Sequence, residues 1–195
     1  MLTSEKVGRT APLALLGGAL WTSVVIIMAL RAPGEAGGNH RDTADLDPLL
    51  LISMLLILVG LAGLHVQQAR NAGWIGKWGF YVTLTGAALF FTGHAGSALG
   101  IKDAWQLVVM PGLLLMVIGS MLFGGAIMQA HVFSRRTGQL LMIAALALIG
   151  FNTEDARAWM AVPFGLAWIA LGWELWHLEA KRYRLSMRMP RRVSG

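Results

Sequence analysis

The sequence has no cysteine and few charged residues, and these two shortages exclude several classes of protein. Without cysteine the chain has no disulfide, no thiolate nucleophile or thiolate metal site, and no cysteine-attached haem. Charged residues make up 13% of the 195 positions and hydrophobic residues 56%, which is more apolar than an ordinary soluble domain. P-loop, Gly-rich dinucleotide and Ser–His–Asp motifs are also missing. The composition therefore favours a single membrane domain that is not a classical enzyme.

The longest apolar stretch, 105–130, has 26 residues without a charge and is soon followed by Arg135 and Arg136. About 20 helical residues cross a hydrocarbon layer that is roughly 30 Å thick. Similar stretches recur along the chain, and the first is longer than the apolar region of a cleaved signal peptide. The sequence therefore predicts an all-α polytopic membrane helix bundle with six transmembrane helices, at about 11–30, 48–66, 79–100, 105–130, 137–152 and 158–176.

The span at 137–152 is the shortest of the six. Its apolar core, QLLMIAALALIG, is 12 residues or about 18 Å long, so a re-entrant segment is the alternative. The charge pattern favours a crossing. With six spans, twelve of the 16 Lys and Arg residues lie on the side of the two termini and four on the other side. The positive-inside rule then predicts a protein of the cytoplasmic membrane with both termini in the cytoplasm.

Three of the predicted spans end alike, in GLHVQQAR, QAHVFSRR and LWHLEAKR. Each has a histidine that is followed by a cation four or five residues later. This pattern indicates three stacked helix hairpins that arose by triplication. The alternative is a chance similarity among helices that are rich in glycine and leucine.

His94 is the ionisable residue that lies well inside a predicted span, and it shares that span with Thr92 and Ser97. Polar groups at this depth are costly and tend to face the interior of a bundle. These three residues are candidates for a proton or ligand-binding site, and His94 also for a haem-iron ligand. A neutral histidine that bonds a neighbouring helix is the structural alternative.

His65, His131 and His177 lie at one predicted depth, near the cytoplasmic ends of their spans. Two such imidazoles on facing helices can ligate a haem iron, so haem is a candidate cofactor. The alternative is that interfacial histidines simply reach toward water. The outer-loop residues His40, Asp42, Asp45 and Asp47 are close enough in sequence to hold a divalent cation, but their spacing does not match an EF-hand. A solvated acidic loop is the favoured interpretation, and no metal site is predicted.

The segment 179–195 is predicted to be a basic cytoplasmic tail. Each cation near an anionic leaflet contributes about 1 kcal/mol before screening, so the tail is expected to contact anionic phospholipids. The alternative is that these cations only fix the orientation during insertion, and nucleic acid is the least favoured partner. The lipid-contact candidates are Lys181, Arg182, Arg184, Arg188, Arg191 and Arg192.

Two runs, LVGLAGLHVQQARNAGWIGKWGFYVTLTGAALFFTG and the region from Pro111 through HVFSRRTGQLLMIAALALIG, resemble small uncharacterised six-span integral membrane proteins of bacteria. The resemblance rests on Gly, Ala and Leu patterning. It implies a six-helix membrane protein and transfers no functional residue. The leading functional hypothesis is a non-enzymatic accessory or interaction subunit that binds a membrane protein partner or forms a homo-oligomer. The alternatives are a carrier of small solutes or hydrophobic ligands and a haem-binding electron-transfer subunit.

Overall fold

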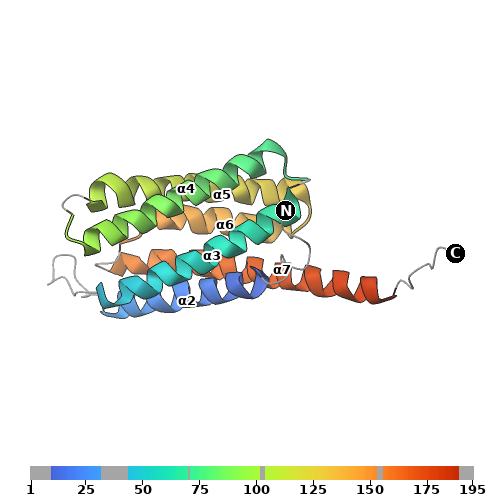
Figure 1. The fold of residues 1–195 in the computed structure, drawn as a ribbon, viewed down its shortest axis with the longest axis horizontal. Coiled ribbons are helices and arrows are strands. Elements are labelled where there is room, and N and C mark those ends of the chain that lie inside the picture. The colour runs from blue at the N-terminus through green and yellow to red at the C-terminus, as the bar shows by residue number, and fades with distance from the viewer. Residues whose placement is uncertain (1–9, 32–43, 70, 102–103, 153–155, 189–195) are drawn as a thin grey trace.

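The chain folds into an all-helical bundle, whose helices run side by side in Figure 1. The computed structural model describes residues 10–31, 44–69, 71–101, 104–152 and 156–188, and no strand occurs within these ranges. The α-helices are α2 (Thr10–Arg31), α3 (Asp47–Gln68), α4 (Gly73–Ala98), α5 (Met110–Ala130), α6 (Arg135–Ala147) and α7 (Val162–Arg188). The all-α prediction is confirmed.

Short helical turns flank four of these helices. The turns are η1 (Ala44–Leu46) before α3, η2 (Trp105–Val109) before α5, η3 (Leu148–Gly150) after α6 and η4 (Ala156–Ala161) before α7. The predicted span 105–130 is therefore not one α-helix, because η2 is a π-helical turn and α5 has Pro111 in its first turn. Proline has no backbone N–H to bond the preceding turn, which is a physical reason for the change of helix type here.

Consecutive helices run antiparallel, and the set closes into a ring because α7 packs along α2. The most extensive of these interfaces is between α4 and α5, and α3 and α4 form the sparsest one. All five connections between consecutive helices therefore join helices that also pack against each other. Figure 1 also shows that α7 continues beyond the rest of the bundle at its C-terminal end.

The α4–α5 interface is a contact between helix backbones. A Cβ atom added to Gly79 would lie 2.6 Å from the backbone nitrogen of Phe123, and one added to Gly93 would lie 2.9 Å from that of Val109. Small residues allow such an approach, which is a common way to pack helices in a membrane. The glycines at this interface are spaced by seven residues, namely Gly79, Gly86 and Gly93 on α4 and Gly112 and Gly119 on α5.

Trp21 of α2 fills the middle of the ring. Its side chain is fully buried, and its indole N–H donates a hydrogen bond to the carbonyl oxygen of Ala161 at 3.0 Å. Its ring contacts those of Phe90, Phe151 and Phe164, with centroid distances of 6.5, 6.1 and 5.5 Å. The core at this level is therefore packed with aromatic side chains that come from several helices.

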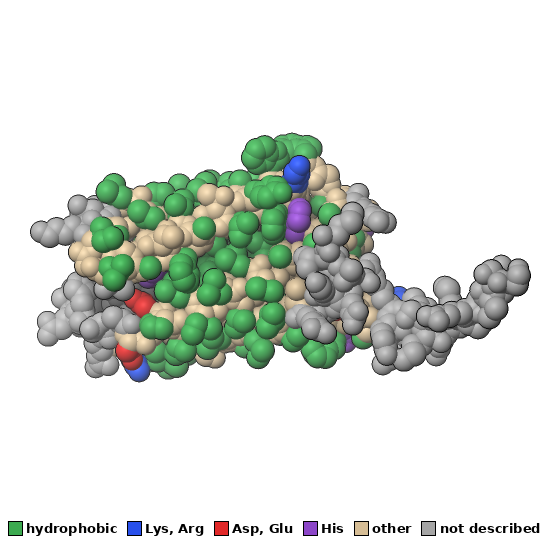
Figure 2. Space-filling view, viewed as in Figure 1, with side chains coloured by type: hydrophobic (Ala, Val, Ile, Leu, Met, Phe, Trp, Pro, Cys, Tyr) green, Lys and Arg blue, Asp and Glu red, His purple; other side chains and the backbone are tan. Residues whose placement is uncertain are grey.

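Four helical segments are long and apolar enough to cross a membrane: Thr10–Arg31, Asp47–Gln68, Leu107–Ala130 and Ala156–Lys181. They correspond to the first, second, fourth and sixth predicted spans. Large hydrophobic side chains are exposed on the bundle, and Figure 2 shows them along the whole length of one face, with the acidic and basic side chains toward its ends. An exposed apolar band of this extent fits lipid rather than water. These are the features of a membrane-embedded helix bundle.

The third and fifth predicted spans are helices, but they do not meet the same requirements of length and composition. Helix α4 has 26 residues, and its glycines, threonines and His94 make it less apolar than the four others. Helix α6 has 13 residues and η3 adds three more, which together reach about 26 Å. The crossing of α4 and α6 stays a prediction.

Candidate functional site

His94 lies in the core near the C-terminal end of α4, as the sequence predicts for a polar group within a span. The residue is 5% exposed, and its ring lies against that of Phe90 with a centroid distance of 4.4 Å. Its Nδ1 atom is 4.0 Å from Oδ2 of Asp47, the first residue of α3. The structure thus brings a carboxylate to the buried imidazole, and such a pair can hold a proton.

Thr92 lies on a different side of α4 from His94 in the described structure. Thr92 is exposed, and its hydroxyl bonds back to the carbonyl oxygens of Ala88 and Leu89 in its own helix, at 2.9 and 3.1 Å. Residues two positions apart point to nearly opposite sides of an α-helix, which separates Thr92 from His94. Ser97 belongs to α4, but its side chain lies outside the described part of the chain.

Two of the three histidines proposed as haem ligands, His65 and His131, lie at helix ends, and His177 lies within α7. The ring of His65 stacks on Phe80 at a centroid distance of 4.2 Å. His131 is exposed and ends α5 in the left-handed conformation, with φ of 53°. Nδ1 of His177 donates to the carbonyl oxygen of Trp173 at 3.1 Å. Within the described residues no two of these histidines contact each other, and haem binding stays a prediction.

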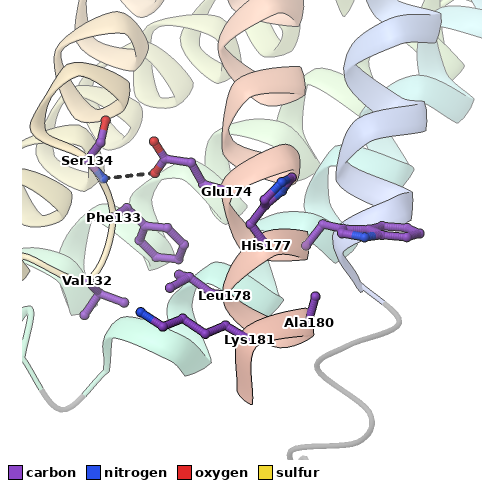
Figure 3. A pocket seen from close by; sticks show the side chains of 9 residues that line it. Val132, Phe133, Ser134, Glu174, His177, Leu178, Ala180 and Lys181 are labelled. Atoms are coloured by element: carbon purple, nitrogen blue, oxygen red, sulfur yellow. Dashed lines mark hydrogen bonds between the residues drawn. The ribbon is translucent and has the colours of Figure 1, made fainter. Parts of the chain in front are cut away.

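A pocket of about 630 Å³ lies between the α5–α6 turn and α7, at the end where α7 leaves the ring (Figure 3). We call it the α7 pocket. Its lining combines an apolar wall with four polar side chains. The lining residues are Val132, Phe133, Trp176, Leu178 and Ala180, and the polar Ser134, Glu174, His177 and Lys181.

Glu174 fixes one wall of the α7 pocket by binding the start of α6. Its Oε2 accepts a hydrogen bond from the backbone N–H of Ser134 at 2.9 Å, as Figure 3 shows, and its Oε1 accepts one from the Thr137 hydroxyl at 2.6 Å. Ser134 is itself the N-cap of α6, since its hydroxyl accepts from the Thr137 backbone N–H. A carboxylate at this position is also stabilised by the positive end of the helix. Glu174 therefore ties α7 to α6.

One of the lipid-contact candidates can be placed. Lys181 is exposed and lines the α7 pocket. The side chains of Arg182, Arg184 and Arg188 lie outside the described part of the chain, as do all atoms of Arg191 and Arg192. Helix α7 runs without a break to Arg188, so the predicted tail begins inside this helix.

The outward face of α4 is a feature that the sequence reasoning missed. Three of its aromatic residues, Trp74, Trp78 and Tyr81, are 69%, 58% and 48% exposed. Toward the C-terminal end of α4, exposed residues with smaller side chains follow these three aromatic residues. The whole row is spaced alternately by four and three residues. We call this row the α4 seam; it consists of Trp74, Trp78, Tyr81, Thr85, Ala88 and Thr92. The same spacing is visible in the sequence and could have predicted a helix-packing face.

The comparison with known proteins adds no further assignment. No protein-family model, no curated protein and no solved structure matches this chain. The resemblance to small bacterial membrane proteins stays a prediction.

Proposed function

We propose that the protein is a six-span interaction subunit of the cytoplasmic membrane, with both termini in the cytoplasm, and that it binds another membrane helix along the α4 seam. The crossing of α4 is supported by its packing, because its backbone follows that of η2 and α5 from Gly79, beside Phe123 of α5, to Gly93, beside Val109 of η2. Helix α5 belongs to a segment that is apolar enough to span. A helix that packs along a spanning helix over this length lies at the same depths in the bilayer and is therefore expected to cross it as well.

The crossing of α6 is supported in the same way, although this helix is short. The backbones of α5 and α6 meet where Gly124 lies beside Gly138, since a Cβ atom on either would be within 2.8 Å of the other's carbonyl oxygen. Leu141, Ala144 and Leu148 continue the buried side along α6 and into η3. A bilayer can thin around a short span at a cost of a fraction of a kcal/mol per Å.

The observation that carries the interaction role is the composition of the α4 seam. Thr85, Ala88 and Thr92 are exposed at mid-helix on a helix that would lie in lipid. The Thr92 hydroxyl is already hydrogen-bonded to its own helix, so it can face lipid without a partner helix. Small and hydroxyl-bearing residues are, however, the residues that line helix–helix interfaces in membranes. Their spacing of four and three residues is that of a left-handed helix pair.

The seam has aromatic side chains at one end, which defines how a partner helix would lie. Trp74, Trp78 and Tyr81 are at the N-terminal end of α4, where an aromatic belt is expected at a membrane interface. The smaller residues follow toward the middle of the bilayer. A partner helix would therefore pack closely over the middle of α4 and diverge at its N-terminal end. A second copy of the chain and another membrane protein both meet this description.

The absence of cysteine from the sequence makes a crosslinking experiment straightforward. We expect Thr85→Cys to give a disulfide-linked dimer in oxidised native membranes if the partner is a second copy. A photoreactive amino acid at position 85 should give one adduct of defined mass if the partner is another protein. Ile143→Cys is the matched control, because Ile143 is 63% exposed on α6 outside the seam. Equal crosslinking at positions 85 and 143 would count against the interaction role.

The two alternative functions stay predictions. A carrier with α4 as its polar lining needs the threonines of α4 on one side, yet Thr83 is buried beside Gly119 while Thr85 and Thr92 are exposed. Uptake into sealed vesicles by the protein and by its His94→Ala variant tests that class. An optical spectrum of protein that was expressed with ample haem tests the haem class through the presence of a Soret band.

A further inference from the structure

We infer that the α7 pocket binds an anionic phospholipid, with the phosphate near Lys181 and an acyl chain against the apolar wall. This inference is separate from the interaction role of α4, since no residue of α4 lines the pocket. It rests on the depth of the pocket, on its charges and on its size relative to its apolar lining.

The depth of the pocket is that of a lipid headgroup. The apolar run of α7 gives way to the charged residues Lys181 and Arg182, and Glu174 lies seven residues before Lys181, which is about 10 Å along a helix. The headgroup layer on each side of the hydrocarbon is roughly 5–8 Å thick. Trp176 lies between these two residues and is 49% exposed, as tryptophan often is at the interface. The pocket therefore extends from the edge of the hydrocarbon into the headgroup layer.

The charges around the pocket suit an anion. Lys181 lies in its lining, and Arg135 and Arg136 are exposed directly after Ser134, another lining residue. The single acid of the lining, Glu174, already accepts hydrogen bonds on both oxygens from the start of α6. Its charge is thereby compensated within the protein, and the three cations remain to attract a phosphate.

The size of the pocket distinguishes a lipid from a small soluble anion. Its volume of about 630 Å³ is in the usual range for ligands much larger than a phosphate ion. Val132, Phe133 and Leu178 form an apolar wall beside Lys181, as Figure 3 shows. A phosphate alone would make no apolar contact with this wall. An acyl chain that packs against the wall would cover it. The combination of a cation with an apolar wall is the chemistry of an amphiphilic anion.

Native mass spectrometry of the detergent-purified full chain tests the inference, with phosphatidylglycerol and phosphatidylcholine as the probes. We expect one phosphatidylglycerol per chain to be retained in preference to phosphatidylcholine. Lys181→Gln should weaken this retention about fivefold, which is the contribution of one cation near an anionic headgroup. Lys77→Gln is the matched control and should leave it unchanged, because Lys77 is an exposed cation of α4 outside the pocket.

A second variant separates the pocket from general attraction by basic residues. Ala180→Phe keeps every charge and places a larger side chain in the lining, so it should abolish selective retention. Should it fail to fold, the comparison of Lys181→Gln with Lys77→Gln still decides the matter. Equal retention of the two lipids, or equal loss in both lysine variants, would overturn the inference. Displacement of the lipid by millimolar glycerol 3-phosphate would overturn it too, because it would identify a soluble anion as the ligand.

Discussion

Gly119 offers a direct test of the contact between α4 and α5. A Cβ atom at this position would lie 2.8 Å from the Cα atom of Thr83, and an ordinary contact begins at 3.4 Å. The Gly119→Ala substitution therefore requires the backbone of α4 to move by at least about 0.6 Å, the difference between these distances, because the backbone nitrogen of Thr83 lies closer still. A backbone cannot yield as a flexible side chain can. We expect overpacking of this kind to cost about 1–3 kcal/mol.

The intrinsic effect of the substitution has to be separated from its packing effect, and Gly125 on the same helix allows this. Alanine is favoured over glycine in a helix by about 1 kcal/mol. An added Cβ at Gly125 meets no atom within 4 Å, so Gly125→Ala should show this gain alone. The difference between the two variants in free energy of unfolding, measured in mixed detergent micelles by circular dichroism, is then the packing cost. Two variants of equal stability would show that the helices do not meet at Gly119.

Two further changes test other contacts. Trp21→Phe removes the hydrogen bond to Ala161 and part of the ring volume in the core, and should lower the free energy of unfolding by about 1–3 kcal/mol in the same assay. Glu174→Ala removes both hydrogen bonds to the start of α6 and should speed hydrogen exchange at the Ser134 and Thr137 amides while exchange in the core stays unchanged. Unaltered exchange at those two amides would mean that Glu174 does not hold α6.

The spanning helices could be predicted from the sequence because hydrophobic length is a local property. The apolar stretch 105–130 needs no partner to identify it, and it lies in one of the four segments that are long and apolar enough. The local change to a π-helical turn at Trp105–Val109 was not predicted, although Pro111 is a visible signal for it. The helical nature of α6 was predicted as well, but its length of 13 residues leaves its crossing open.

The candidate sites were harder to predict because they depend on which face each residue occupies and on distant partners. Helical periodicity alone places Thr92 and His94 on different sides of α4. The contact of His94 with Asp47 joins two helices and has no signal in the sequence. The same holds for Glu174, whose partners lie 37 and 40 residues away along the chain.

The seven-residue repeats of α4 are visible in the sequence, and they mark two faces of the helix. Gly79, Gly86 and Gly93 mark the face that packs on α5, and Thr85 and Thr92 mark the exposed face. Each set repeats every seven residues, as expected for two helix-packing faces of one helix. The sequence alone does not show which of the two faces is covered within the chain, because that depends on the position of α5.

The central claim is that all six helices cross the membrane, and cysteine labelling from one side tests it most directly. We expect Leu99→Cys and Ile149→Cys, at exposed positions near the ends of α4 and η3, to react with a membrane-impermeant maleimide in intact cells. Trp74→Cys and Arg136→Cys, near the opposite ends of α4 and α6, should react only after permeabilisation. Labelling of both ends of α4, or of α6, from the same side would contradict the six-span account.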